Sequence, residues 1–151
     1  MKNTTLCYIE YNGKYLMLHR TKKKNDENVD KWIGVGGKFE AGESPFDCAR
    51  REIKEETGLE DLPLSYRGIV TFVSNEYGTE YMHLFTAPAK SDKIDVICDE
   101  GELEWIEKAE VLNLPIWEGD KIFLKLLDER RDFFSLKLTY SKDSLSSYVI
   151  E

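Results

Sequence analysis

The segment of residues 37–59 constrains the fold of this 151-residue chain more than any other part of the sequence. Ser44-Pro45 is typical of a helix start, because a serine hydroxyl caps the first turn and proline is preorganised for the first helical position. Asp47 adds a negative charge to that first turn, where it suits the helix dipole. Thr57-Gly58 ends the run with a glycine that can cap the helix C-terminus. The segment therefore predicts a helix from about Ser44 to Thr57, with a loop on either side.

Three glutamates share one face of this predicted helix. At about 100° per residue, Glu52, Glu55 and Glu56 fall within about 100° of one another. Like charges at i, i+4 spacing cost about 0.2–0.5 kcal/mol per pair on an isolated helix, so three of them favour a compensating cation. Oxygen ligands with room for water and phosphate suit Mg²⁺ or Mn²⁺. The alternative for these residues alone is a solvated acidic face, and on either interpretation we expect Glu56 at an exposed position.

The rest of the chain predicts mostly strands. The glycine-rich stretch 31–39 predicts a backbone that turns tightly or approaches another group closely. Asn12-Gly13 between alternating runs predicts an N-terminal hairpin, and the basic stretch 21–31 predicts a loop. The predicted strands are 4–10, 15–20, 66–74, 80–88, 103–106 and 133–140, the last of these being the final strand, and a second amphipathic helix covers 118–129. Strands mixed with two helices indicate an α/β layered fold with helices on both sides of a sheet.

Composition limits the class of protein and its partners. The sequence shows no linker, repeat or low-complexity tract, so residues 1–151 are predicted to form a single domain. The net charge of −8 argues against a nucleic-acid polymer as partner. No stretch approaches the ~20 apolar residues that cross a bilayer, and the alternating start does not resemble a signal peptide. The three cysteines share no CxxC spacing, which favours neither a disulfide framework nor a zinc site, and a reduced cytoplasmic compartment is expected.

The spacing of the whole segment 37–59 resembles the Nudix box. That motif is G-x5-E-x7-R-E-U-x-E-E-x-G-U, where U is a bulky aliphatic residue. This chain fits it at every specified position: Gly37, Glu43, Arg51, Glu52, Ile53, Glu55, Glu56, Gly58 and Leu59. The resemblance to Nudix hydrolases implies an α/β/α sandwich around a mixed β-sheet, with the box forming a catalytic loop–helix–loop.

The resemblance also implies roles for the residues of the box. The three helix glutamates would supply oxygen ligands to Mg²⁺ or Mn²⁺, with the Gly36 carbonyl as a further ligand. Glu52 is also a candidate for deprotonating or orienting the attacking water. Arg51 and Glu43 would form an ion pair that fixes the helix carboxylates. Cations held there would neutralise phosphate oxygens and align a water for in-line attack.

Outside the box, the chain resembles MutT-type 8-oxo-dGTP diphosphatases, most closely the mutator enzymes of Gram-positive bacteria. The resemblance covers nearly the whole chain, including 6–20, 31–38 and 100–105. It implies that Glu100, five positions before Trp105, joins the metal site as a similarly placed acidic residue does in the animal oxidised-purine triphosphatases. The alternative for Glu100 is an acidic residue that only forms a turn.

The same resemblance implies a base-binding segment. Trp117 and Asp120 match a Trp-x-x-Asp pattern in which the tryptophan stacks on the purine and the aspartate pairs with its edge. Alternatively, Trp117 belongs to the core and Asp120 is simply in the first turn of the second helix. Two positions depart from the animal enzymes. Ile33 stands where they carry an asparagine, and Gly119 where they carry a second acidic residue, so selectivity for an oxidised base stays open.

Further candidate substrate-binding residues surround the box. Gly37, Ile33 and Lys38 lie in or next to the glycine-rich stretch, and Lys23 lies in the basic stretch 21–31. Lys38 could meet a phosphate or be solvated. His83 lies in an apolar run, which is typical of a core histidine rather than a catalyst.

These observations together predict a magnesium-dependent enzyme. We expect it to hydrolyse a nucleoside triphosphate, such as the oxidised purine nucleotide 8-oxo-dGTP, to the monophosphate and pyrophosphate. One alternative within the family is hydrolysis of ADP-ribose or a dinucleoside polyphosphate. Another, from a different class, is a non-catalytic nucleotide-binding protein. The expected partner is a small nucleotide, and the sequence does not give the oligomeric state.

Overall fold

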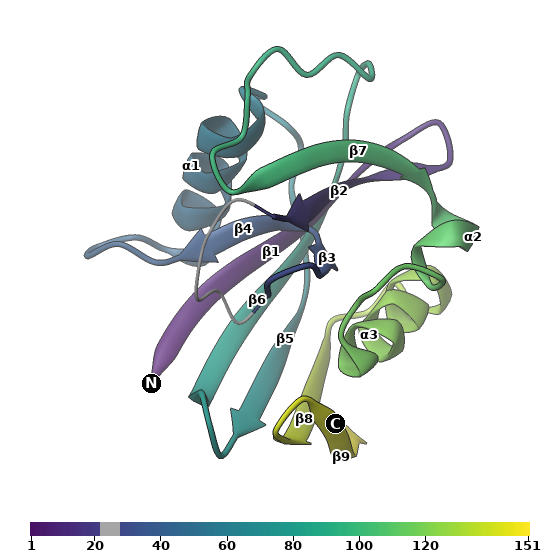
Figure 1. Cartoon of the computed structure of the whole chain (residues 1–151). Coiled ribbons are helices and arrows are strands. Elements are labelled where there is room, and N and C mark those ends of the chain that lie inside the picture. Colours follow the sequence, from purple (N-terminus) through teal and green to yellow (C-terminus); the bar gives the residue numbers. More distant parts are fainter. Residues whose placement is uncertain (22–27) are drawn as a thin grey trace.

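The computed structural model describes residues 1–21 and 28–151 (Figure 1). Its helices are α1 (Pro45–Thr57), α2 (Lys108–Val111) and α3 (Glu118–Glu129). Its strands are β1 (Lys2–Tyr11), β2 (Lys14–Arg20), β3 (Trp32–Ile33), β4 (Val35–Lys38), β5 (Ser65–Ser74), β6 (Gly78–Pro88), β7 (Gly101–Glu107), β8 (Phe134–Ser141) and β9 (Ser144–Ile150).

The strands form one mixed sheet in the order β3-β2-β1-β6-β5-β8-β9, with β4 paired to β1 and β7 paired to β2. The β1–β6 and β5–β8 pairs are parallel, and the other pairs are antiparallel. A parallel pair needs a long crossover connection. The connection from β1 to β6 carries α1, and the connection from β5 to β8 carries α3.

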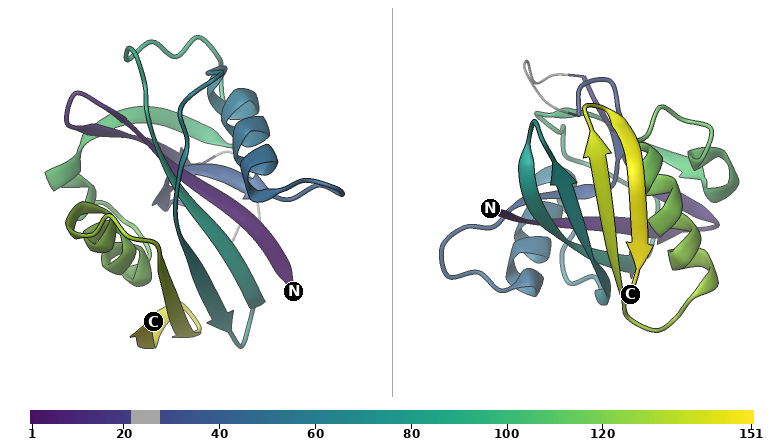
Figure 2. Two further views of the ribbon diagram at one scale, coloured as in Figure 1. Left: turned by 180° about the vertical axis from the view of Figure 1, so that it is seen from behind. Right: turned by 90° about the horizontal axis from the view of Figure 1, so that it is seen from below.

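The two long helices cover opposite faces of the sheet (Figures 1 and 2). On one face, Ala49 and Ile53 of α1 pack with buried residues such as Phe85. On the other, a larger core joins α3 to the sheet through residues such as Phe123 and Leu138. The predicted α/β/α arrangement is therefore confirmed. No helix of the described ranges is long and apolar enough to cross a membrane.

The termini of α1 follow from local sequence. The Ser44 hydroxyl accepts a hydrogen bond from the Asp47 backbone N–H at 3.1 Å, and the Asp47 carboxylate accepts one from the Ser44 N–H at 3.0 Å. This reciprocal pair is a capping box that fixes where the helix begins. Gly58 ends it with a φ of 77°, a left-handed conformation that favours glycine. The helix predicted from Ser44 to Thr57 is confirmed.

The structure differs from the predicted elements in several places. The strand predicted at 133–140 is not the final one, because β9 pairs with β8; its side chains are mostly exposed, so no alternating pattern reveals it. The short helix α2 was not predicted, since four residues are too few to show a period. Of the two alternatives for the glycine-rich stretch, the close approach to other groups holds, because Gly36 and Gly37 lie in the extended strand β4 rather than in a tight turn. Several strands also begin or end one or two residues beyond their predicted bounds.

Candidate active site

Two glycines of β4 stand where a side chain would not fit. A Cβ atom on Gly36 would lie 1.9 Å from the carbonyl oxygen of Thr5 in β1. A Cβ atom on Gly37 would lie 2.6 Å from the carboxylate of Glu52 in α1. Neither glycine has a positive φ, so the close approach of other groups explains them rather than a turn. The absence of a side chain at Gly37 lets α1 pack directly against β4, and its absence at Gly36 lets β4 lie close to β1.

The Glu56 carboxylate lies beneath β4. The expectation that Glu56 is exposed is wrong, because only 6% of the residue is accessible. Its Oε2 accepts a hydrogen bond from the Gly36 backbone N–H at 3.1 Å, whereas its buried Oε1 has no partner among the described residues. In an antiparallel ladder the N–H and C=O of one residue face the same way. The Gly36 carbonyl therefore also faces the helix carboxylates.

Glu52 and Glu100 complete a cluster of carboxyl groups around Glu56. Burial, followed by the neighbouring Glu100, raises the pKa of Glu56 to about 10. Burial is also the main cause that raises the pKa of Glu52, with the charges of Glu55 and Glu100 adding to it and Arg51 opposing it. Glu100 immediately precedes β7, so the loop before that strand brings it to α1. Glu55 lies at the exposed rim of the same helix face.

Arg51 braces this cluster. Its Nε and Nη2 donate to the two carboxylate oxygens of Glu43 at 2.7 and 2.9 Å. Its Nη1 donates to Glu52 at 2.8 Å and to Glu55 at 3.3 Å, and its Nη2 donates to the Lys38 carbonyl at 2.9 Å. The guanidinium holds the pKa of Glu43 at about 2. The expected ion pair is present, and it ties the loop before α1 to the helix glutamates.

Arg51→Ala is expected to lower both the melting temperature and the turnover rate, since it releases Glu43 and Glu52 together. Removing a residue that orients a metal ligand typically lowers metal affinity or activity by about 10–100-fold. Arg50→Ala is the matched control, because the Arg50 guanidinium lies over the Phe46 ring and contacts no carboxylate among the described residues. Thermal melts and kcat/KM of both variants check this. An inactive Arg51→Ala variant with an unchanged melting temperature would contradict the bracing role.

The Arg51–Glu43 pair also has a pH signature. A carboxyl whose pKa is lowered by folding stabilises the fold above its ordinary pKa of 4.5, and this contribution is lost as the pH falls towards about 2. The melting temperatures of the wild type and Arg51→Ala should therefore converge as the pH falls through that window.

The chemistry of the cluster fits a hard divalent cation. Within residues 1–21 and 28–151, no group of three or more His, Cys, Asp and Glu side chains is placed so that it could hold a metal ion as it stands, and Arg51 engages Glu52 and Glu55. The unpartnered Oε1 of Glu56, buried beside Glu100, is nevertheless an atom that a cation would satisfy. The groups that could hold such a cation are Glu52, Glu55, Glu56, Glu100 and the Gly36 carbonyl.

A cleft of about 930 Å³ is lined by two carboxylates of the cluster and by the predicted base-binding residues. Gly36, Glu52 and Glu100 line it, and so do Trp117 and Asp120 from the start of α3. The structure therefore brings together groups that lie far apart in the sequence.

Trp117 is part of the core and of the cleft wall at once. It is 7% exposed, and its ring meets Phe72 and Tyr140 edge-on at centroid distances of 6.1 and 5.5 Å. Its Nε1 donates to the Asn28 side-chain oxygen at 2.7 Å, and the Lys31 ammonium lies 5.0 Å from the ring centroid. The two alternatives for Trp117 are therefore not exclusive.

Asp120 is buried without a hydrogen bond to its carboxylate from any described residue, although it lines the cleft. Burial, followed by the charge of Glu80, raises the pKa of this carboxyl to about 8. Hydrogen bonds donated to Asp120 by a ligand would favour its ionised form, because they offset the cost of burying the charge.

Three of the other four candidate substrate-binding residues lie in the cleft wall. Ile33, Gly37 and Lys38 line the cleft, with the Lys38 side chain exposed. Lys23 lies outside the described residues. His83 is hydrogen-bonded to the Tyr66 hydroxyl and the Asn3 side-chain oxygen, as expected of a structural histidine.

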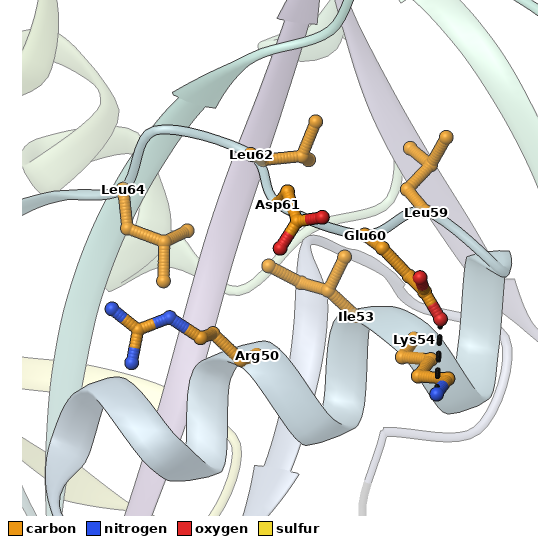
Figure 3. A pocket seen from close by; sticks show the side chains of 8 residues that line it. All are labelled: Arg50, Ile53, Lys54, Leu59, Glu60, Asp61, Leu62 and Leu64. Carbon is orange, nitrogen blue, oxygen red and sulfur yellow. Dashed lines mark ion pairs between the residues drawn. The ribbon is translucent and has the colours of Figure 1, made fainter.

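Sequence reasoning missed four charged residues of the cleft, Lys2, Arg20, Glu40 and Glu80, of which Arg20 and Glu80 contact or face predicted site residues. Arg20 is 8% exposed and lies 3.3 Å from Glu100, and Glu80 lies near Asp120. Each is a charged residue at one end of a predicted strand, the only local signal that could have drawn attention to it. A second hollow, of about 290 Å³, lies between α1 and residues 59–64 and is lined by none of the predicted site residues (Figure 3).

Comparisons with known proteins place this site in a family. The model of the NUDIX domain matches residues 2–127. The chain belongs to the Nudix family. It is therefore a Nudix hydrolase, and the similarity extends to the whole fold. The mutator protein MutT of Bacillus halodurans superposes with a TM-score of 0.85 at 29% identity, over 100% of this chain and 98% of that one. The predicted MutT-type resemblance is confirmed.

Two curated relatives of this Nudix hydrolase carry different names. The oxidized purine nucleoside triphosphate hydrolase of Mus musculus is 27% identical over 138 residues, which are 85% of this chain and 82% of the relative. The ADP-ribose pyrophosphatase of Bacillus subtilis is 28% identical over 130 residues, which are 85% of this chain and 63% of the relative. Nearly equal identity to both leaves the substrate to be argued from the site.

Proposed function

We propose that this Nudix hydrolase cleaves a nucleoside triphosphate, with a purine such as guanine or 8-oxoguanine as its base, to the monophosphate and pyrophosphate. The observation that carries the proposal is that one cleft is lined both by Glu52 and Glu100 of the carboxylate cluster and by Asp120, which is buried and receives no hydrogen bond to its carboxylate from the described residues. The similarity to a purine nucleoside triphosphate hydrolase supports the same reaction.

The carboxylate cluster would serve the phosphate chain. Glu52, Glu56, Glu100 and the Gly36 carbonyl would hold the cation, with Glu55 at its rim. When bound, the cation would neutralise phosphate oxygens and lower the pKa of a coordinated water. Glu52, which Arg51 holds in place, would orient the attacking water or take up its proton. Arg20 and Lys38 line the same cleft and add positive charge for a polyphosphate.

The start of α3 would serve the base. Asp120 would hydrogen-bond to the purine edge, and Trp117, supported by Phe72, would form the adjoining apolar wall. A polar group that is left unpaired by the wrong base discriminates strongly between substrates. Asp120 is thus the residue from which we expect selectivity among bases.

Asp120→Ala should change the preference among nucleotides rather than scale all rates alike. Trp117→Phe should instead raise KM for every base, because it trims the wall and removes the hydrogen bond to Asn28 without removing a polar contact to the base. Alanine at this buried position would also disturb the core. Asp128→Ala, an exposed position on the same helix, is the control. The measurement is kcat/KM for 8-oxo-dGTP, dGTP and dCTP. Equal scaling of all three in Asp120→Ala would show that Asp120 does not read the base.

A substrate panel tests the function itself. With Mg²⁺ present, dGTP or 8-oxo-dGTP should yield pyrophosphate and the monophosphate faster than ADP-ribose or a dinucleoside polyphosphate is cleaved. Faster cleavage of ADP-ribose would replace the proposed substrate class. Nucleotide binding without turnover of any of them would indicate a nucleotide-binding protein instead.

A further inference from the structure

Glu80 is a carboxylate of the cleft that the catalytic cluster does not include. It lies in β6, paired with Lys2 of β1 and with Phe72 of β5. Paired residues of neighbouring strands share a face of the sheet, so Glu80 lies on the face of Phe72, which contacts Trp117. The side chain is 18% exposed, and it lines the same cleft as Asp120.

The Glu80 carboxylate is held in place but not saturated. The Thr4 hydroxyl donates to its Oε2 at 2.7 Å, and the Lys2 ammonium lies 3.3 Å from its Oε1. An ionised carboxylate offers about four acceptor positions, so these two contacts leave capacity for a ligand. A side chain fixed in this way can present its remaining lone pairs in one direction.

Asp120 provides an independent sign that a ligand belongs beside Glu80. Asp120 is 8% exposed, lines the cleft, and receives no hydrogen bond to its carboxylate from any described residue. A buried polar group without a partner is costly, and a ligand that donates to it removes that cost. Among the charged groups, Glu80 has the largest effect on the pKa of Asp120. Together with the shared cleft lining, this places the two carboxyl groups in the same part of the cleft.

We propose that Glu80 is a specificity-determining residue that acts with Asp120 to select bases with two neighbouring N–H donors on one edge. Guanine and 8-oxoguanine have such an edge in N1–H and the 2-amino group. Adenine and cytosine present one donor beside a ring-nitrogen acceptor, which a second carboxylate repels. The inference rests on the proposed nucleoside triphosphate substrate and specifies its base.

The comparison of dGTP with dITP isolates this contact, because hypoxanthine differs from guanine only in lacking the 2-amino group. The wild type should favour dGTP in kcat/KM by about 10–100-fold, the range expected for a hydrogen bond to a charged group. In Glu80→Gln that ratio should fall at least about tenfold, chiefly through slower dGTP turnover, with dITP little changed. Glu76→Gln removes the same charge from the exposed β5–β6 hairpin and should keep the wild-type ratio.

The outcomes separate the inference from the function on which it rests. If Glu80 only links β1 to β6, Glu80→Gln should lower the rates for dGTP and dITP by the same factor, and an unchanged ratio overturns the inference alone. Thr4→Val, which removes the hydrogen bond to Glu80 but keeps its charge, should reduce the ratio less than Glu80→Gln does. A wild type that hydrolyses neither nucleotide in Mg²⁺ overturns the proposed function, and the inference with it.

Discussion

Glu56→Gln is expected to reduce kcat by about a thousandfold while leaving the metal-free protein at least as stable as the wild type. Metal-borne charge stabilisation is worth several kcal/mol in the transition state, and each 1.36 kcal/mol is tenfold in rate. Glutamine keeps the shape and the hydrogen bond from the Gly36 N–H. It removes the negative charge that we propose for the cation.

The metal-free Glu56→Gln variant should be more stable than the wild type although its kcat is lower. The reason is that the Glu56 carboxyl is buried with one oxygen unpartnered among the described residues. Its pKa is raised from 4.5 to about 10, so the folded metal-free protein keeps a proton that the unfolded chain loses above about pH 4.5. The wild type therefore loses stability as the pH rises through this window, and Glu56→Gln does not. The melting temperature of the variant in EDTA should exceed that of the wild type by more at pH 9 than at pH 5.

Glu60→Gln is the matched control for both measurements. Glu60 is exposed just beyond α1 and, among the described residues, pairs with Lys54 at 2.9 Å, a surface contact of little energetic weight. It should change neither rate nor melting temperature appreciably. If Glu56→Gln retained near-wild-type kcat, the buried carboxylate would be a structural feature outside the reaction.

Gly36→Ala and Gly37→Ala should fail in different ways although they are adjacent. The added Cβ at position 36 meets backbone atoms of Thr5 at 1.9 and 2.6 Å, which cannot move without separating β4 from β1. We expect destabilisation at or above the upper end of the 1–3 kcal/mol range typical of overpacking, about 3 kcal/mol, visible as a large fall in melting temperature or a failure to fold.

At position 37 the three atoms nearest to the added Cβ all belong to the end of the Glu52 side chain, at 2.6 to 2.8 Å. That side chain can rotate away, so the fold should survive while Glu52 loses its place. A displacement of about 1 Å in a catalytic group can cost about a hundredfold in rate. We expect Gly37→Ala to melt close to the wild type with kcat reduced by about that factor. A fully active Gly37→Ala variant would argue against a role for Glu52 in positioning water or metal.

Much of the fold and the helix carboxylates were predictable because their causes are local. The capping box at Ser44 and the glycine at position 58 lie within a few residues of the ends of α1, so the local sequence shows both. Ala49 and Ile53 repeat with the helical period, and both pack against the sheet. The ion pair between Arg51 and Glu43 also follows from a fixed spacing in the box.

The remaining features depend on contacts between distant segments. Glu56 is buried because β4 carries glycine where α1 packs, and helix spacing alone cannot distinguish this from an exposed face. Glu80 meets Asp120 only through the pairing of β6 with its neighbours and the placement of α3 over the sheet. Exposed β9 carries no alternating pattern, since neither of its faces is fully covered.

The central claim is that the carboxylates around Gly36 hold a divalent cation that this chain needs in order to split a nucleoside triphosphate. The most direct test is the time course of pyrophosphate and monophosphate released from dGTP, with and without Mg²⁺, for the wild type and Glu56→Gln. We predict equal amounts of the two products for the wild type in Mg²⁺, none in excess EDTA, and about a thousandfold slower release for Glu56→Gln. Persistent turnover in EDTA, or release of orthophosphate in place of pyrophosphate, would contradict the account.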